Sequence, residues 1–435
     1  MSVQPLERFT RWKRGLLAGL LPLVAMAAAQ AQETDRPAGV ASLRLSGFGS
    51  LGLVHVDAPD GWGYRRELTQ GGSGANWRHD VDTRLGVQLN YSVGSQFELV
   101  AQAIAKKRGS YSHDSDALEW AYASYRPNAD WTLRAGRVNL DAFLMADYRN
   151  VGYGFTAARP PVELYAMLPT TLDGVDVARS WFQGDAQWRA KLMLGSAQIG
   201  DFATADPGRV RDIAGLMLAR EEGGLLMRAS ASRTRIELDL TSAQAAVDTL
   251  AQLGSLPIPV VADQARLLRD RLGASDIWAT FLELGLRYEL ADWQWSAEVV
   301  RISAAPLVRQ TSAYATVGHR VGDWTPYIGY GRTRDAMPMM GTPIWQAALT
   351  PVLGPAGAVG TQMLGSLVTE SVNRSRVQQS GWSIGTRWDF HPQAALKLQW
   401  DRVHVQAGGP GLWTDASGSM AGRASVATAV VDFIF

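Results

Sequence analysis

The residue types that support covalent or metal chemistry are sparse in this chain of 435 residues. Cysteine is absent, which excludes thiol catalysis, disulfides and cysteine-ligated zinc or iron–sulfur sites. An H-E-x-x-H zinc motif is absent, and the single G-x-S-x-G match, residues 381–385, falls inside an expected strand instead of at the strand-to-helix turn of a nucleophile elbow. The six histidines are scattered, at His55, His79, His113, His319, His391 and His404. We therefore expect no enzyme, no metal and no cofactor.

The 34-residue segment 139–172 instead carries charged residues together with apolar side chains such as Phe143 and Leu144. Its charged members are Asp141, Asp147, Arg149, Arg159 and Glu163. In a narrow aqueous passage, such charges would act on passing ions at short range and set selectivity. The alternative is that they form ion pairs that only hold the segment in place, and both roles can hold at once.

The elements around this segment show the two-residue period of β-strands rather than a helical period. Leu85, Val87 and Leu89 share one face of a segment, while Arg84, Gln88 and Asn90 share the other. We expect sixteen strands, at about 42–56, 81–92, 96–106, 115–126, 130–138, 173–182, 185–196, 209–220, 223–236, 276–290, 293–303, 309–320, 323–333, 378–390, 393–405 and 424–435. Most have the roughly 9–11 residues with which a tilted strand crosses a bilayer.

The connections between these strands alternate in length. Turns of two or three residues, such as 183–184 and 321–322, alternate with longer segments, except for the short connection 304–308. The longer segments are 57–80, 107–114, 139–172, 197–208, 237–275, 334–377 and 406–423. This arrangement is typical of an antiparallel transmembrane barrel with both termini on the short-turn side. A soluble β-sandwich has no reason to sort its loops in this way.

Composition agrees with a barrel and limits its partners. The 44 glycines and 16 tryptophans, with only 19% charged residues, fit many strands and tight turns. Lys plus Arg (42) nearly equals Asp plus Glu (41), so the chain lacks the positive field that nucleic-acid binding needs. No nucleic-acid partner is expected.

The N-terminus predicts export. Arg11, Lys13 and Arg14 precede an apolar stretch that ends in Ala29-Gln30-Ala31. These are the three regions of a cleavable secretory signal, so residues 1–31 are expected to be removed. Residues 32–435 then form a single barrel domain.

Alternation assigns many charged wall residues to the interior, because a charge facing lipid at mid-bilayer costs about 2–4 kcal/mol. The predicted inner set is Arg44, Arg84, Glu98, Arg134, Arg189, Lys191, Arg228, Glu283, Arg287, Glu298, Arg387, Lys397 and Asp401. Its basic excess favours an anion preference. Arg84 and Arg134 lie on strands near segment 139–172, so we expect them to face its acids across a constriction.

The last strand carries a family resemblance. Ala427, Ala429, Val431 and Phe433 alternate with Thr428, Val430, Asp432 and Ile434, and the chain stops on Phe435. This resembles the C-terminal signature of Gram-negative outer-membrane proteins, which the barrel-assembly machinery recognises. Motifs in and around segment 139–172, including Arg159-Pro160-Pro161 and Asp173-Gly174-Val175-Asp176, resemble the bacterial porin superfamily. The Pro-Glu-Phe-Gly-Gly motif of enteric general porins is absent, so pore size and selectivity are not carried over.

The resemblance implies an all-β, sixteen-stranded antiparallel transmembrane barrel whose third loop, 139–172, folds inward. It also implies a homotrimer in the outer membrane, in contact with its lipid, that passes small hydrophilic solutes and ions. The first alternative is a barrel transporter for a specific or hydrophobic substrate, which needs an apolar lumen and an N-terminal plug; about ten residues before the first strand are too few for a plug. The second alternative is a barrel hydrolase. Within 237–275, we expect helices at Ala243 to Leu253 and Ala262 to Leu272, separated by Pro257 and Pro259.

Overall fold

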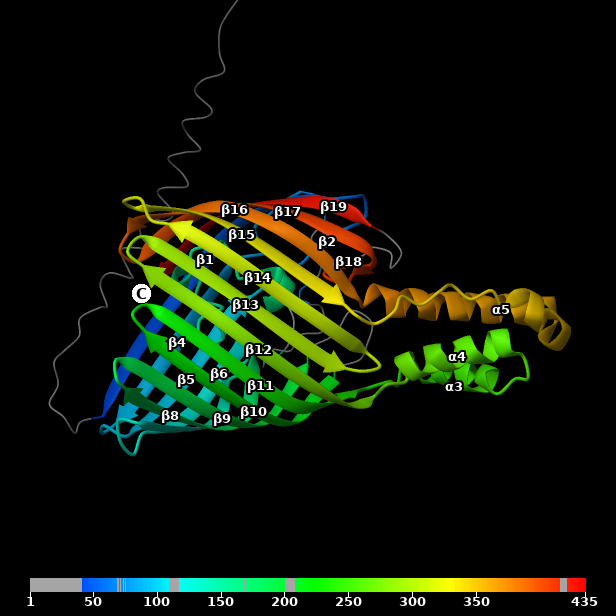
Figure 1. Cartoon of the computed structure of the whole chain (residues 1–435), viewed down its shortest axis with the longest axis horizontal. Helices are drawn as coiled ribbons and strands as arrows, with labels where there is room; N and C mark the ends of the chain where they lie inside the picture. The colour runs from blue at the N-terminus through cyan, green and yellow to red at the C-terminus, as the bar shows by residue number, and fades with distance from the viewer. Residues whose placement is uncertain are drawn as a thin grey trace, which may run out of the picture.

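A closed, sixteen-stranded antiparallel β-barrel forms the body of the chain in the computed structural model (Figure 1). The structure describes residues 41–68, 70, 72, 74, 76–108, 117–166, 169–199, 208–414 and 421–435. The expected signal, 1–31, lies outside these residues. The barrel closes because β1 (Ser42–Asp57) pairs with β19 (Gly422–Ile434) on one side and with β4 (Arg84–Val93) on the other.

Each remaining barrel strand pairs with its neighbour in sequence. These strands are β5 (Phe97–Lys106), β6 (Leu118–Tyr125), β7 (Trp131–Asn139), β8 (Thr171–Gln183), β9 (Ala186–Ile199), β10 (Gly208–Glu222), β11 (Leu225–Leu238), β12 (Asp276–Leu290), β13 (Trp293–Ala304), β14 (Val308–His319), β15 (Trp324–Asp335), β16 (Val377–His391) and β17 (Ala394–Pro410). Short β3 (Trp77–Arg78) pairs with β1, and β2 (Gly63–Tyr64) pairs with β18 (Trp413–Thr414). All sixteen predicted strands are confirmed, with ends that differ by a few residues.

The two-residue period separates an apolar outer face from a polar inner face. On β12, Leu284 is 62% exposed on the outside, whereas the neighbouring Glu283 is 2% exposed and faces the interior. Aromatic rings lie outward near the short turns, including Trp131, Trp293 and Trp324. A soluble sandwich would bury its apolar face in a core, so this inverted pattern identifies a barrel built for lipid surroundings. No helix among the described residues is long and apolar enough to cross a bilayer.

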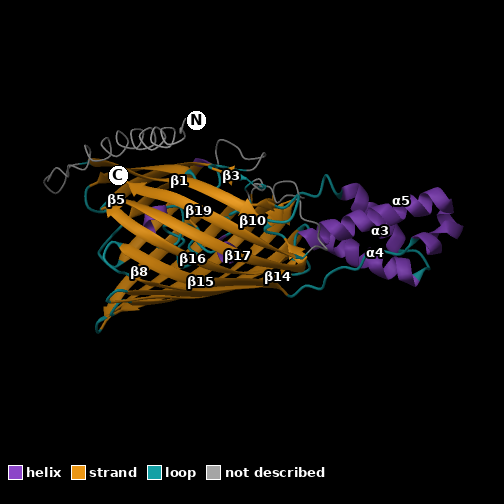
Figure 2. Ribbon diagram, turned by 90° about the horizontal axis from the view of Figure 1, so that it is seen from above, coloured by secondary structure: helices purple, strands orange, loops and turns teal. Residues whose placement is uncertain are grey.

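The connections differ at the two ends of the barrel. Gly184, Gly223 and Gly322 adopt positive φ in the short turns at one end, a conformation that favours glycine. From the opposite end, the helices α3 (Gln244–Gly254), α4 (Pro259–Leu272) and α5 (Gln346–Arg374) extend beyond the rim (Figure 2). The two predicted helices are thus present, but Pro259 begins α4 rather than only separating the pair, because the first helical turn tolerates proline.

The third loop folds inward, as predicted. It contains the 3₁₀ turn η2 (Gly152–Gly154) and the short helix α2 (Val162–Tyr165). Phe143 and Tyr165 of the loop pack against Phe281 of β12 and Tyr314 of β14, whose side chains point into the barrel. Burial of this apolar cluster holds the loop against one part of the inner wall.

Candidate pore constriction

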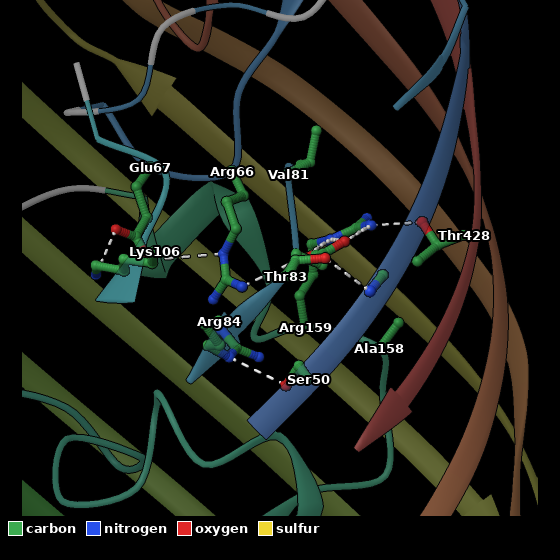
Figure 3. A network of polar contacts seen from close by, with 12 residues as sticks. Ser50, Arg66, Glu67, Val81, Thr83, Arg84, Lys106, Ala158, Arg159 and Thr428 are labelled. Carbon is green, nitrogen blue, oxygen red and sulfur yellow. Dashed lines mark hydrogen bonds and ion pairs between the residues drawn. The ribbon is translucent and has the colours of Figure 1, made fainter. Parts of the chain in front are cut away.

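Arg159 of the third loop is the centre of a buried ionic cluster. Its guanidinium binds Asp82 at 2.6 Å and Asp401 of β17 at 3.0 Å, and it donates to Thr428 of β19. It also lies over the ring of Tyr64. Figure 3 shows Arg159 reaching from the loop towards β19. A buried guanidinium needs such partners, and these partners fix the loop to several parts of the wall.

The first long connection adds a second set of charges beside this cluster. Arg66 binds Asp82 at 3.2 Å, and Lys106 of β5 binds Glu67 at 2.9 Å (Figure 3). Burial by itself raises the pKa of Asp82, but Arg159 and Arg66 outweigh it and hold the pKa below its usual range. Burial likewise opposes ionisation of Glu67, and Lys106 and Arg66 hold its pKa below the usual range.

Sequence reasoning missed Asp82, Arg66 and Glu67. The signal for Asp82 was available, because it shares the inward parity of Arg84 within the predicted strand 81–92. In the structure, β4 begins at Arg84, so Asp82 lies in the preceding turn, where it still points inward and is 1% exposed. No periodicity marks Arg66 or Glu67, since they lie in an irregular connection.

Asp141 anchors the beginning of the third loop to the opposite part of the wall. It accepts from Lys191 of β9 and from Arg228 of β11, the latter at 2.5 Å. Arg228 also binds Glu283 of β12 at 3.2 Å. Burial raises the pKa of Asp141, but Lys191 and Arg228 together lower it below its usual range.

Glu163, also predicted for the site, has neutral partners. Its carboxylate accepts from the side-chain amide of Gln379 at 3.0 Å, and its backbone carbonyl accepts from the hydroxyl of Thr333 at 2.6 Å. Burial raises the pKa of this carboxyl, and the negative charge of Asp401 adds to the effect. Glu163 therefore resembles a hydrogen-bonding anchor more than a charge presented to the lumen.

The remaining predicted residues lie on the same loop or nearby. Arg149 donates to the backbone carbonyl of Tyr165 at 2.6 Å, which stabilises the loop internally. Asp147 accepts from the amide of Asn139, and the same Asn139 accepts from Arg134 at 2.9 Å. Asp147 and Arg134 are thus joined through one amide side chain.

Arg84 and Arg134 find their direct partners on the wall. Arg134 binds Asp176 of β8 at 2.6 Å, and Arg84 donates to the Ser50 hydroxyl at 3.2 Å. Asp432, beside Ser50, binds Lys397 of β17 at 3.0 Å. Asp176 and Asp432 were absent from the predicted inner set, although their alternation within β8 and β19 points inward. Their charges offset part of the basic excess expected from the sequence.

Some inward-facing cations lie outside these clusters. Arg44 of β1 and Arg189 of β9 are exposed, and both lie near the short-turn end of the barrel. Within the described part of the chain, no group of three His, Cys, Asp or Glu side chains is arranged to hold a metal. The site is therefore an inner loop anchored to the barrel wall by buried ion pairs.

No protein-family model matches the sequence, and no curated protein matches it either. Solved structures do match. An anion-selective porin from Comamonas acidovorans is 10% identical, with a TM-score of 0.50, over 91% of this chain and 100% of that chain. A Salmonella typhi OmpF in complex with daunomycin is 11% identical, also with a TM-score of 0.50, over 90% and 97%. The chain therefore has a porin-type fold, as the sequence resemblance predicted.

Proposed function

We propose that this protein is an outer-membrane porin through which small hydrophilic solutes and ions diffuse passively. The observation that carries the proposal is the closed barrel of sixteen strands with a charged inner face and an anchored inner loop. Barrels of about this size enclose an aqueous channel. A channel of this kind needs neither a catalytic group nor a cofactor, and its inner face is too polar for a hydrophobic-substrate transporter.

The channel leans towards anions. Most charges around the third loop are paired, so their fields largely cancel at a distance. Arg44 and Arg189 contribute exposed positive charge near the short-turn mouth. The match to a porin described as anion-selective supports the same preference for anions.

Export and assembly complete the proposal. Residues 1–31 direct the chain across the inner membrane and are removed, the barrel inserts into the outer membrane, and three copies form a homotrimer. Phe435 is the residue through which the barrel-assembly machinery recognises the chain. The apolar outer face and the aromatic residues at the short-turn end support insertion into a bilayer.

Reversal potential across a planar bilayer in a salt gradient tests conduction and selectivity together. The parent barrel should conduct and should favour the anion. The double variant Arg44→Gln/Arg189→Gln should shift the reversal potential towards cations, most strongly at low ionic strength, where screening is weakest. Arg211→Gln, a change on the outer face, is the matched control and should leave the potential unchanged. A non-conducting parent would refute the porin, whereas an unchanged potential in the double variant would refute only the role of Arg44 and Arg189.

A further inference from the structure

A basic patch lies on the outer face of the barrel, near the end opposite the short turns. It consists of Arg301 on β13, Arg309 on β14, and Arg332 and Arg334 on β15, and all four are exposed. Arg301 pairs with Leu282 of β12, which is itself exposed on the lipid-facing side. Arg332 follows the outward ring of Tyr330 by two residues, so it shares that face. We name these four residues the rim patch.

Strand register makes the rim patch contiguous. Thr311 of β14 lies between Arg301 and Arg334, because it pairs with both. Arg309 is two residues from Thr311 on the same face, and Arg332 pairs with Ala313. Neighbouring strands are about 4.8 Å apart, so the four guanidiniums lie within reach of one anionic group or two adjacent ones. β13, β14 and β15 run side by side in Figure 1.

Among the described residues of β13, β14 and β15, no acidic side chain faces outward. The outward positions of the three strands are Trp293, Trp295, Ala297, Val299, Arg301 and Ser303; Arg309, Thr311, Ala313, Ala315, Val317 and His319; and Trp324, Pro326, Ile328, Tyr330, Arg332 and Arg334. The contrast with β10 to β12 is direct, since Arg211 pairs there with Glu237 and Arg235 with Asp276. The rim patch therefore carries positive charge that its own face does not neutralise.

The depth of the patch matches a lipid headgroup. Trp324 marks the short-turn edge of the apolar band, and Arg332 and Arg334 follow it by eight and ten residues. At about 3.3 Å per residue and a tilt of about 40°, these arginines lie roughly 20–25 Å higher, near the far edge of a band about 25 Å tall. Just below them, Tyr330 and Trp382 have ring centroids 4.8 Å apart, an arrangement suited to the membrane interface.

We propose that the rim patch binds the phosphorylated headgroup of a lipid in the leaflet on the long-loop side. This inference rests on the barrel spanning a membrane, which is part of the proposed function. Arginine binds phosphate oxygens through two parallel N–H donors, and here several arginines surround the same place. The acyl chains of such a lipid would pack on the apolar residues below the patch. The connection between β13 and β14 is short, so it leaves the headgroup position open.

Native mass spectrometry of the purified barrel in detergent, titrated with phosphatidic acid, tests the proposal. Each arginine near an anionic lipid surface contributes about 5-fold in affinity, so Arg332→Gln/Arg334→Gln should weaken phosphatidic acid binding by roughly 30-fold. Arg211→Gln/Arg235→Gln is the matched control, because those arginines occupy the same outer face but already have acidic partners. It should change the affinity little.

Three results would overturn the proposal. Equal weakening in the two double variants would show a nonspecific charge effect, and unchanged binding in both would show that the patch does not hold the lipid. Displacement of phosphatidic acid by millimolar inorganic phosphate would point to a free-phosphate site instead. Both double variants should keep the parent conductance and reversal potential. If conductance and reversal potential changed while lipid binding stayed intact, the result would count against the proposed channel and not against the lipid site.

Discussion

Single residues fix how the third loop crosses the lumen, and Arg159 is the main one. Two carboxylates, Asp82 and Asp401, share its charge in a site that solvent barely reaches. Removing the cation leaves Asp401 buried without a cationic partner and leaves Asp82 with Arg66 alone. Breaking a buried pair in this way costs about 3–5 kcal/mol, whereas an exposed pair contributes about 0–1 kcal/mol.

Arg159→Met should therefore release the third loop from the wall while the barrel remains closed. We expect more frequent conductance fluctuations in single-channel recordings and faster proteolysis within residues 139–170. The exposed Arg211→Gln serves as the control and should resemble the parent. Adding Asp401→Asn to Arg159→Met should restore part of the parent behaviour, because the carboxylate left without a cationic partner is then removed. If the single variant is as quiet and as protease-resistant as the parent, Arg159 does not anchor the loop.

Glu163 and Glu67 should give opposite pH dependences. Burial raises the pKa of Glu163, so its stabilising contribution is present below the usual carboxyl pKa and is lost as pH rises through the raised value. Glu163→Gln should thus raise the unfolding temperature at pH 8 and have little effect at about pH 4. Lys106 and Arg66 overcome burial and lower the pKa of Glu67, so its contribution is present above the usual pKa and is lost on acidification.

Thermal unfolding of Glu67→Gln provides the matched comparison. This variant should unfold at a lower temperature than the parent at pH 8, and the gap should close as pH falls below about 4. Glu163→Gln and Glu67→Gln make the same change of side chain, at carboxyls that have different partners. Shifts of the same sign at pH 8 would contradict the assigned environments.

At the scale of elements, the helices beyond the rim form a unit with its own core. Trp345 is fully buried between α4 and α5, where its indole N–H donates to Gln264 at 3.0 Å. The adjacent Ile344 is 78% exposed. The helical unit is therefore held by side chains that are separate from those of the barrel.

Trp345→Ala should loosen the helical unit without opening the barrel. Truncating a buried tryptophan lowers folding stability by about 3–5 kcal/mol. A unit of a few packed helices would fray after a loss of that size. Limited proteolysis should cut within 237–275 and 336–376, while heat-modifiable migration of the barrel on a gel stays unchanged. Ile344→Ala should give the parent digestion pattern. Loss of the barrel band in Trp345→Ala would show that the two units do not fold separately.

At the scale of the whole molecule, closure of the barrel brings the two ends of the described chain together. Phe435 exchanges two backbone hydrogen bonds with Gly47, at 2.8 and 3.0 Å, and its ring lies against that glycine. A side chain at position 47 would collide with the ring, so Gly47 is required there. The terminal residue thus has a structural role in addition to the proposed recognition role.

Phe435→Ala separates these roles, because it keeps the backbone bonds and removes the aromatic ring. If the assembly machinery reads the ring, the variant should refold in detergent like the parent but accumulate less folded barrel in the outer membrane of cells. Heat-modifiable migration measures both amounts. Equal losses in detergent and in cells would leave only the structural role, and no loss in either would remove both.

The sequence determined the strands, the direction of their faces and the sorting of turns from loops. These features follow from a period of two residues and from turn composition, and both signals lie in residues that are close together in the sequence. It also placed the charged residues of segment 139–172 and the helices of 237–275, because local composition carries those signals. The sequence did not predict the partners of these charges. Arg159 binds Asp82 and Asp401, which are 77 and 242 residues away, and no local pattern encodes such pairings.

Tertiary structure alone decided which charges remain exposed to the lumen. Alternation gave Arg134 and Lys397 an inward direction, but the register of β7 with β8 and of β17 with β19 placed Asp176 and Asp432 beside them. It also aligned arginines of three strands in the rim patch, since register depends on pairing across the sheet. Whether a side chain points inward or outward is a local property of its strand. Whether its charge is neutralised depends on which residues the fold brings within a few ångströms of it.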